Sequence, residues 1–268
     1  RKRQYEDISL ELYDAQADTQ KQISLVENAI VKEFDLIIVQ PRNSDALSPV
    51  LNEVVDAGID LITTNPKVEG IEGASFVDAD PYAQAGVVAI QARNQVPQNA
   101  NVVVLYGPPG NLHAIVRKKA WQQIFFQNRP DVNVIGEQIA NWNKSEAMDY
   151  MEDWVTRAEG KIDAIISMND NMAAGAIEVL KDNEDYAPED VYAYGVDGTA
   201  EAVQLIEEGW LTATCFQNAY ELGKINMETA HKLLTGEEEQ IHTYIGTPLI
   251  TQSNLEELRS VHEEAGNL

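Results

Sequence analysis

Short runs of strand-forming residues alternate with helical patterns along the whole chain. The runs lie at residues 9–13, 35–39, 60–64, 74–77, 101–106, 132–139, 164–168, 191–196 and 211–216. Alternation of this kind is typical of a parallel α/β sheet, because parallel strands need crossover connections that are usually helical. No polar linker interrupts this alternation, which argues against independent domains connected by flexible linkers.

The segments between these runs carry helix signals. Residues 17–33 form an amphipathic pattern, and residues 46–57 form a second helix that ends before Gly58. Ser44 or Asp45 is a suitable N-cap for that second helix. The apolar positions of the first pattern are Ile23, Val26, Ile30 and Val31.

A third helix is expected to open at Pro81, because proline suits the first helical turn. Asp78 and Asp80 come just before it, and we interpret both as caps of this helix rather than as ligand-binding groups.

The net charge of the chain limits the kinds of molecule that it can bind. The 268 residues carry a formal net charge of −25, with no basic stripe that would neutralise phosphates. Nucleic acid and anionic membrane surfaces are therefore disfavoured, and so are anionic ligands. Neutral and cationic ligands remain open.

Sequence motifs for catalysis and metal binding are missing. The four histidines are scattered, and the chain has no HExxH, no GxSxG, no P-loop and no paired-glycine dinucleotide fingerprint. The single cysteine, Cys215, lies in an apolar strand-like run and is interpreted as a small buried hydrophobe. No apolar run is long enough to span a bilayer, and no segment has the pattern of a signal peptide. If the protein is exported, its targeting segment is expected to have been removed already.

Three stretches place amides or carboxylates just past a strand-forming run. They are SMNDNMAAGA with Asn169, YGVDGTAEA with Asp197, and TCFQNAYELG with Gln217. The carboxyl ends of parallel strands line one crevice, so these groups should converge on a common ligand. Carboxylates and amides together satisfy vicinal hydroxyls, which predicts a small, hydroxyl-rich ligand.

These stretches resemble the sugar-binding periplasmic proteins of ABC importers, the type I solute-binding family with ribose, glucose/galactose and inositol-type receptors. The motifs DLIIVQP, LITTNPK, LYGPPGNLHAIVRKKAW and IANWNKSE extend the resemblance over nearly the whole chain. It implies an α/β fold with two Rossmann-like lobes, each built on a parallel sheet, joined by a three-segment hinge. The lobes would be residues 1–79 plus 218–247 and residues 80–217 plus 248–268.

The resemblance also implies that the family's first strand and helix are missing from this sequence. That strand would lie between the strands expected at 9–13 and 35–39. The N-terminal lobe should then show a gap between these two strands. Because a buried central edge with unpaired backbone groups is costly, something should fill that gap.

The ligand-binding residues that the resemblance implies come from both lobes. Gln40 and Asn65 belong to the N-terminal lobe, and Gln217 lies at a crossover. Pro66 stands where ribose binders have an arginine, which argues against ribose, and His113 stands where glucose/galactose binders have an acid. The residues expected from the C-terminal lobe are Asn111, His113, Arg117, Trp142, Asn169 and Asp197.

Trp142 matches the family's sugar-stacking aromatic, since axial C–H groups of a sugar ring pack on an aromatic face. Trp121 and Trp154 have helix-core spacing and are interpreted as core residues. Asp170 is expected to cap a helix starting at Asn171, and Gly198 to allow a tight turn.

The resemblance implies a periplasmic or extracellular receptor that closes on a neutral sugar or cyclitol by hinge motion. It would act as a monomer without cofactor or metal and deliver the ligand to a membrane ABC permease; a lipid anchor is left open. A sugar sensor or chemoreceptor partner remains an alternative, as does a sugar-acting enzyme using Asp197 with His113. The sensing core of a lactose-repressor-type regulator shares the fold, but its DNA-binding segment is absent here.

Overall fold

The computed structural model describes residues 5, 8–158 and 161–268, and the chain divides into two compact units. The first unit comprises Arg1–Ala79, Gly110–Leu112 and Ala219–Ile245. The second comprises Asp80–Pro109, His113–Asn218 and Gly246–Leu268. No helix in this described part of the chain is both long and apolar enough to cross a membrane.

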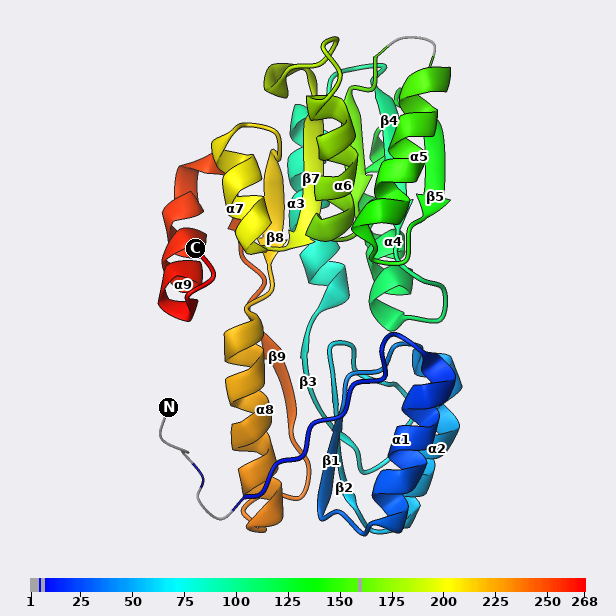
Figure 1. Ribbon diagram of the computed structural model, residues 1–268, viewed down its shortest axis with the longest axis vertical. Coiled ribbons are helices and arrows are strands. Elements are labelled where there is room, and N and C mark those ends of the chain that lie inside the picture. The colour runs from blue at the N-terminus through cyan, green and yellow to red at the C-terminus, as the bar shows by residue number, and fades with distance from the viewer. Residues whose placement is uncertain (1–4, 6–7, 159–160) are drawn as a thin grey trace. The chain divides into compact units, whose positions relative to one another are not determined.

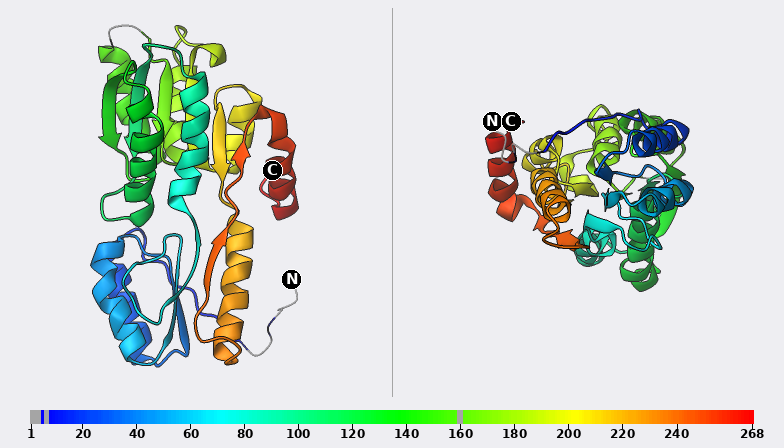
Figure 2. Two further views of the ribbon diagram at one scale, coloured as in Figure 1. Left: turned by 180° about the vertical axis from the view of Figure 1, so that it is seen from behind. Right: turned by 90° about the horizontal axis from the view of Figure 1, so that it is seen from below.

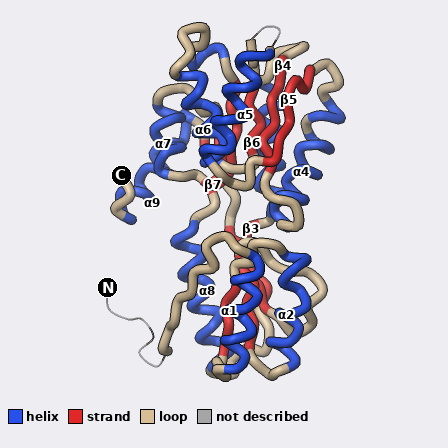
Figure 3. The backbone as a smooth tube through the Cα atoms, turned by 45° about the vertical axis from the view of Figure 1, so that its right-hand side comes forward, coloured by secondary structure: helices blue, strands red, loops and turns tan. Residues whose placement is uncertain are grey.

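The first unit is a four-stranded parallel sheet with strand order β1-β2-β3-β9 and helices on both faces (Figure 1, Figure 3). Its strands are β1 (Leu36–Val39), β2 (Asp60–Thr64), β3 (Ser75–Ala79) and β9 (His242–Ile245). Strand residues alternate between two cores: one is shared with α1 (Thr19–Val31) and α2 (Ser44–Asp56), the other with α8 (Ala219–Leu234).

The second unit is a six-stranded sheet with strand order β10-β8-β7-β6-β4-β5, in which only the pair β10 and β8 is antiparallel. Views from opposite sides show α5, α6 and α7 over one face and α3 and α4 over the other (Figure 1, Figure 2). Its strands are β4 (Asn101–Tyr106), β5 (Asn133–Ile139), β6 (Ala164–Ser167), β7 (Tyr192–Asp197), β8 (Ala213–Phe216) and β10 (Leu249–Ile250). Its helices are α3 (Pro81–Gln95), α4 (Leu112–Ile124), α5 (Lys144–Arg157), α6 (Asp170–Lys181), α7 (Ala200–Glu207) and α9 (Leu255–Ala265).

The α/β class with parallel sheets is confirmed, and eight of the nine expected strands form within two residues of their predicted bounds. The strand expected at 9–13 is wrong. That segment is irregular, and Leu12 is 86% exposed, because no strand among the described residues pairs with it. Residues 9–13 and the edge strand β1 are not paired with one another there, and the missing family strand stays a prediction. The sequence reasoning also missed the short strands β9 and β10.

Helix caps differ from expectation by small shifts. The N-cap of α2 is Asn43, whose side chain accepts from the backbone N–H of Ala46, so the helix begins earlier than predicted. Asp80 caps α3 as expected, with Pro81 in the first turn. Asp78 does not cap α3. Its carboxylate instead accepts from the backbone N–H groups of Lys67 and Ala79 inside the first unit.

Helices α5 and α6 approach closely at Gly175. A Cβ atom there would lie 2.3 Å from the carbonyl oxygen of Lys144, a backbone atom that cannot swing away. The Lys144 ammonium in turn lies 2.8 Å from carboxylate oxygens of both Glu178 and Glu201. Glycine at 175 therefore sets the spacing of the two helices on this face of the sheet.

Replacing Gly175 by alanine should destabilise the second unit by about 1–3 kcal/mol, because the added methyl group overpacks a backbone contact. Gly223→Ala in α8 is the matched control: nothing lies within 4 Å of a Cβ there, and loss of glycine flexibility should stabilise by about 0.5–1 kcal/mol. Urea unfolding of both variants measures the two signs. Equal effects would contradict the proposed close contact.

Candidate functional site

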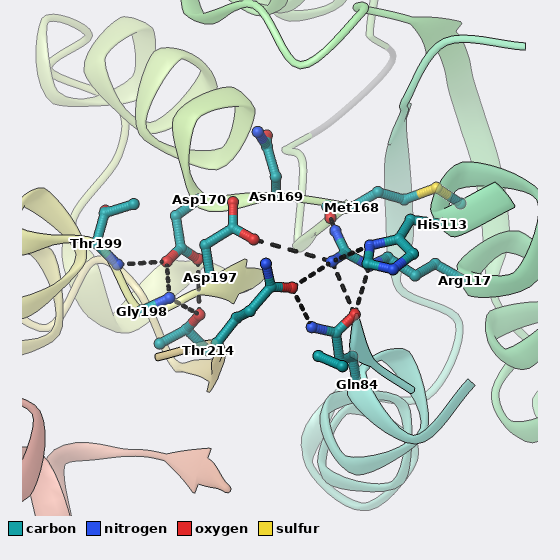
Figure 4. A network of polar contacts seen from close by, with 12 residues as sticks. Gln84, His113, Arg117, Met168, Asn169, Asp170, Asp197, Gly198, Thr199 and Thr214 are labelled. Carbon is teal, nitrogen blue, oxygen red and sulfur yellow. Dashed lines mark hydrogen bonds and ion pairs between the residues drawn. The ribbon is translucent and has the colours of Figure 1, made fainter. Parts of the chain in front are cut away.

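A buried arginine organises the polar groups at the carboxyl ends of the second unit's strands. Arg117 lies on α4 and is 3% exposed. Its Nε and Nη2 donate to Oε1 of Gln84 at 3.2 and 2.8 Å, and its Nη1 donates to the backbone carbonyl of Met168 at 2.7 Å (Figure 4). These bonds hold the guanidinium between α3 and the end of β6, so it has one fixed orientation.

The same guanidinium reaches three of the predicted ligand-binding residues. Its Nη2 donates to Oε1 of Gln217 at 3.3 Å, lies 3.3 Å from Nδ1 of His113, and lies 3.9 Å from Oδ1 of Asp197. Gln84 also donates to Gln217, which joins the two side chains that accept from the arginine. Arg117, His113, Asp197 and Gln217 therefore form one cluster.

Asp197 ends β7 in a turn that few residues can adopt. The backbone φ is 121° at Asp197 and 69° at Gly198, both in the left-handed region. A Cβ atom on Gly198 would lie 2.6 Å from the Phe216 ring, so glycine is required there for space as well as for conformation. The expectation that Gly198 permits a tight turn is confirmed.

A second buried carboxylate holds this turn. Asp170 is 1% exposed and accepts from the backbone N–H groups of Gly198 and Thr199 at 2.6 and 3.0 Å (Figure 4). Its other oxygen accepts from the Thr214 hydroxyl at 2.7 Å. Asp170 was expected to cap a helix starting at Asn171, and this is wrong, because its side chain crosses to the loop after β7 instead.

The cap of α6 is Asn169, whose Oδ1 accepts from the backbone N–H of Met172 at 2.9 Å. The helix begins at Asp170, one residue earlier than expected. With Oδ1 used for capping, the other polar group of the Asn169 side chain is the Nδ2 amide, which can only donate.

Burial sets the electrostatics of the two carboxyl groups. It raises the pKa of Asp170; the neighbouring Asp197 charge raises it further, while the bonds from Thr199, Thr214 and Gly198 oppose the rise. Burial also raises the pKa of Asp197, and the Arg117 guanidinium opposes that rise. The Asp197 side chain is 33% exposed, so its desolvation is weaker than that of Asp170.

Trp142 lies beside Arg117, in the turn between β5 and α5. The guanidinium carbon is 5.6 Å from the indole centroid, within the range of cation–π attraction. A side chain on Gly107 would overlap the indole, with its Cβ 2.1 Å from ring carbon Cη2. Trp121 and Trp154 are buried in the core, as expected.

The other predicted ligand residues belong to the first unit. Gln40 is exposed just after β1, and Asn65 follows β2 with φ 40°. Asn111 was expected in the C-terminal lobe, but the structure groups it with the first unit, where its Nδ2 donates to the Arg42 carbonyl oxygen at 3.3 Å. Ligand contact by these residues, as by the other six, stays a prediction.

Sequence reasoning missed Gln84 and Thr214 and assigned Asp170 to a different role. Gln84 carries no motif signal, because its importance comes from a partner 33 residues away. Cys215 is confirmed as a core residue: it is buried, and burial raises the pKa of its thiol to about 12. Within residues 5, 8–158 and 161–268, no group of His, Cys, Asp and Glu side chains is arranged to hold a metal ion.

Comparison with known proteins places this geometry in a family. The sequence profile described as "Periplasmic binding protein domain" matches residues 2–238. The chain belongs to this family. A putative rhizopine-binding protein of Rhizobium meliloti is 31% identical over 257 residues, which covers 94% of this chain and 82% of the relative.

Two solved structures are similar over nearly the whole chain. An ABC transporter solute binding protein from Bacillus halodurans C-125 with bound myo-inositol has a TM-score of 0.89 at 30% identity, covering 96% of this chain and 88% of that one. The Caulobacter myo-inositol binding protein bound to myo-inositol has a TM-score of 0.88 at 27% identity, covering 96% and 87%.

Changing Asp197 to Asn should alter how stability depends on pH. A raised carboxyl pKa means that the folded protein holds the proton more tightly than the unfolded chain, whose value is near 3.8. Asp170 and Asp197 both have raised pKa values in the folded protein. The free energy of unfolding of the wild type should therefore fall as the pH rises from the unfolded-chain pKa through the pKa values of the folded protein. Asp197→Asn removes one of the two carboxyl groups and also removes the negative charge that raises the pKa of Asp170. Its free energy of unfolding relative to wild type should therefore increase by about 1 kcal/mol between about pH 4 and about pH 8.

Urea unfolding across that pH range measures the difference. Glu152→Gln, at an exposed position of α5, is the matched control and should track wild type. A relative stability of the Asp197 variant that falls as pH rises would contradict the assignment.

Proposed function

We propose that this protein is an extracytoplasmic receptor that captures a small neutral polyol, a sugar or a cyclitol, and delivers it to an ABC importer. The observation that carries the proposal is the cluster of Arg117, His113, Asp197 and Gln217 beside the Trp142 ring. It offers donors and acceptors for hydroxyl groups next to an aromatic face for C–H groups.

The charge balance of the cluster favours a neutral ligand. The Arg117 charge is offset by the Asp197 carboxylate 3.9 Å away, so little positive charge remains for an anion. The net charge of −25 acts in the same direction over longer distances. A polyol needs no net charge from its site, only paired donors and acceptors.

A cyclitol is the first ligand to test. The two solute-binding structures with bound myo-inositol are 27% and 30% identical to this chain. Pro66 and His113 depart from the ribose and glucose/galactose patterns that the resemblance provides. Gln40, Asn65 and Asn111 are proposed as the first unit's contribution to binding.

We further propose that the protein performs no covalent chemistry. The acid–base pair considered for an enzyme, Asp197 with His113, shares the Arg117 guanidinium, which contacts both groups. That contact favours the ionised carboxylate and occupies an imidazole nitrogen, which suits hydroxyl binding better than proton transfer. The relatives are named as binding proteins. Location outside the cytoplasm, a permease partner and a monomeric state belong to the same proposal.

A thermal-shift screen against pentoses, hexoses and cyclitols tests the receptor function. A ligand present at about 100 times its dissociation constant should add about 2.7 kcal/mol to the free energy of unfolding. The same ligands, and their glycosides, should remain chemically unchanged after prolonged incubation. A screen in which no polyol stabilises the protein would contradict the proposal, and turnover would favour the enzyme alternative.

Arg117→Lys is the sharpest single variant for the binding site. Arg117→Ala would leave Gln84 and the Met168 carbonyl without donors, so it should destabilise the fold as well as binding. Lysine keeps the charge but loses the planar fork, and it should weaken binding of myo-inositol by about 10-fold or more. Calorimetry measures the affinity.

Lys119→Gln is the control for Arg117→Lys, because it changes an exposed cation on the same helix. It should bind like wild type. Equal affinities of the Arg117 variant and wild type would remove Arg117 from the binding site.

A further inference from the structure

The C-terminal helix α9 contacts the turn that Asp197 and Gly198 form after β7. Nε2 of His262 lies 2.7 Å from the carbonyl oxygen of Gly198. The adjacent side chain on this helix face, Leu258, is fully buried and would lie 3.1 Å from a Cβ on Gly198. None of the motifs at the strand ends includes α9, so its role is not explained by them.

The donor in this contact is fixed by chemistry. A carbonyl oxygen only accepts, so the His262 ring carries a proton on Nε2 and donates it. The other ring nitrogen, Nδ1, lies 3.4 Å from the Asn267 side-chain nitrogen, which completes a chain from Asn267 through His262 to Gly198.

Both polar groups of the Gly198 residue are thereby held. Asp170 accepts from its N–H and from that of Thr199, while His262 donates to its carbonyl oxygen. The turn needs such restraint, because Asp197 has a backbone φ of 121°, a conformation that costs free energy and persists only when its surroundings enforce it.

We propose that His262 is a positioning residue for ligand binding: by holding the Gly198 carbonyl, it keeps the Asp197 carboxylate in its binding orientation. This rests on the proposed function, in which Asp197 receives ligand hydroxyls. The C-terminal helix is then part of the binding machinery, although His262 touches no ligand.

His262 is not required to attach α9 to the second unit. Leu255 and Leu258 are buried in its core, and Arg259 forms an ion pair with Glu207 of α7. A loss of the His262 contact should therefore loosen the turn while the helix remains in place. This separates positioning from general stability and provides a control on the same helix.

The test uses three variants of the full chain. His262→Ala removes the donor, His262→Gln retains a side-chain N–H donor, and Arg259→Gln breaks the ion pair with Glu207 without touching the turn. Hydrogen exchange at the Gly198 and Thr199 amides is measured without ligand, together with melting temperature and calorimetric affinity for myo-inositol.

We expect His262→Ala to speed exchange at both amides and to weaken binding about 10-fold, the effect of one lost hydrogen bond. His262→Gln should recover much of both. Arg259→Gln should lower the melting temperature without changing either.

Unchanged exchange at Gly198 and Thr199 in His262→Ala overturns the proposal. So does unchanged affinity when wild type binds myo-inositol, or an equal loss of affinity in Arg259→Gln. If wild type binds no polyol of the panel, the proposed function fails, and the exchange result still decides whether His262 holds the turn.

Discussion

The burial of one guanidinium determines how this site is built. An unpaired charge inside a protein is strongly unfavourable, so Arg117 must be surrounded by acceptors. It obtains them from Gln84 on α3, the Met168 carbonyl at the end of β6, Gln217 after β8 and Asp197 at the end of β7. The arginine thus connects segments that are distant in sequence. These protein contacts alone fix its orientation.

The Asp197 turn is the second constraint, and it depends on groups outside the Arg117 cluster. Gly198 supplies the backbone conformation and the space, Asp170 accepts from the amides, and His262 donates to the carbonyl. Asp170 is buried where ionisation is costly, while Asp197 keeps a third of its side chain exposed. One carboxylate therefore shapes the turn, and the other keeps part of its surface open to solvent.

The sequence predicts the buried central strands well, but it predicts short strands and the N-terminal segment poorly. Strands such as β4 and β6 are buried on both faces, so their apolar runs are unambiguous. Residues 9–13 alternate apolar and polar side chains but have no partner strand among the described residues. The two-residue strand β10 is too short to produce a pattern.

Some site residues can also be predicted from the sequence and others cannot. Asn169, Asp197 and Gln217 lie at or just past the ends of strands, so their placement at one edge of the sheet is predictable from parallel topology. Gln84 and His262 are not predictable, because each matters through a contact that is distant along the chain, 33 residues from Gln84 to Arg117 and 64 residues from Gly198 to His262. Side-chain pairing at that range depends on packing, which local patterns do not encode.

The indole N–H resonances of the four tryptophans provide the most direct test of where the ligand binds. Titration with myo-inositol, or with the best polyol from the screen, should shift the Trp142 resonance most, because that ring lies beside Arg117. Trp121, Trp154 and Trp210 are buried in the core and should change little. Saturable binding that leaves the Trp142 resonance in place would contradict a ligand site built on Arg117 and Asp197.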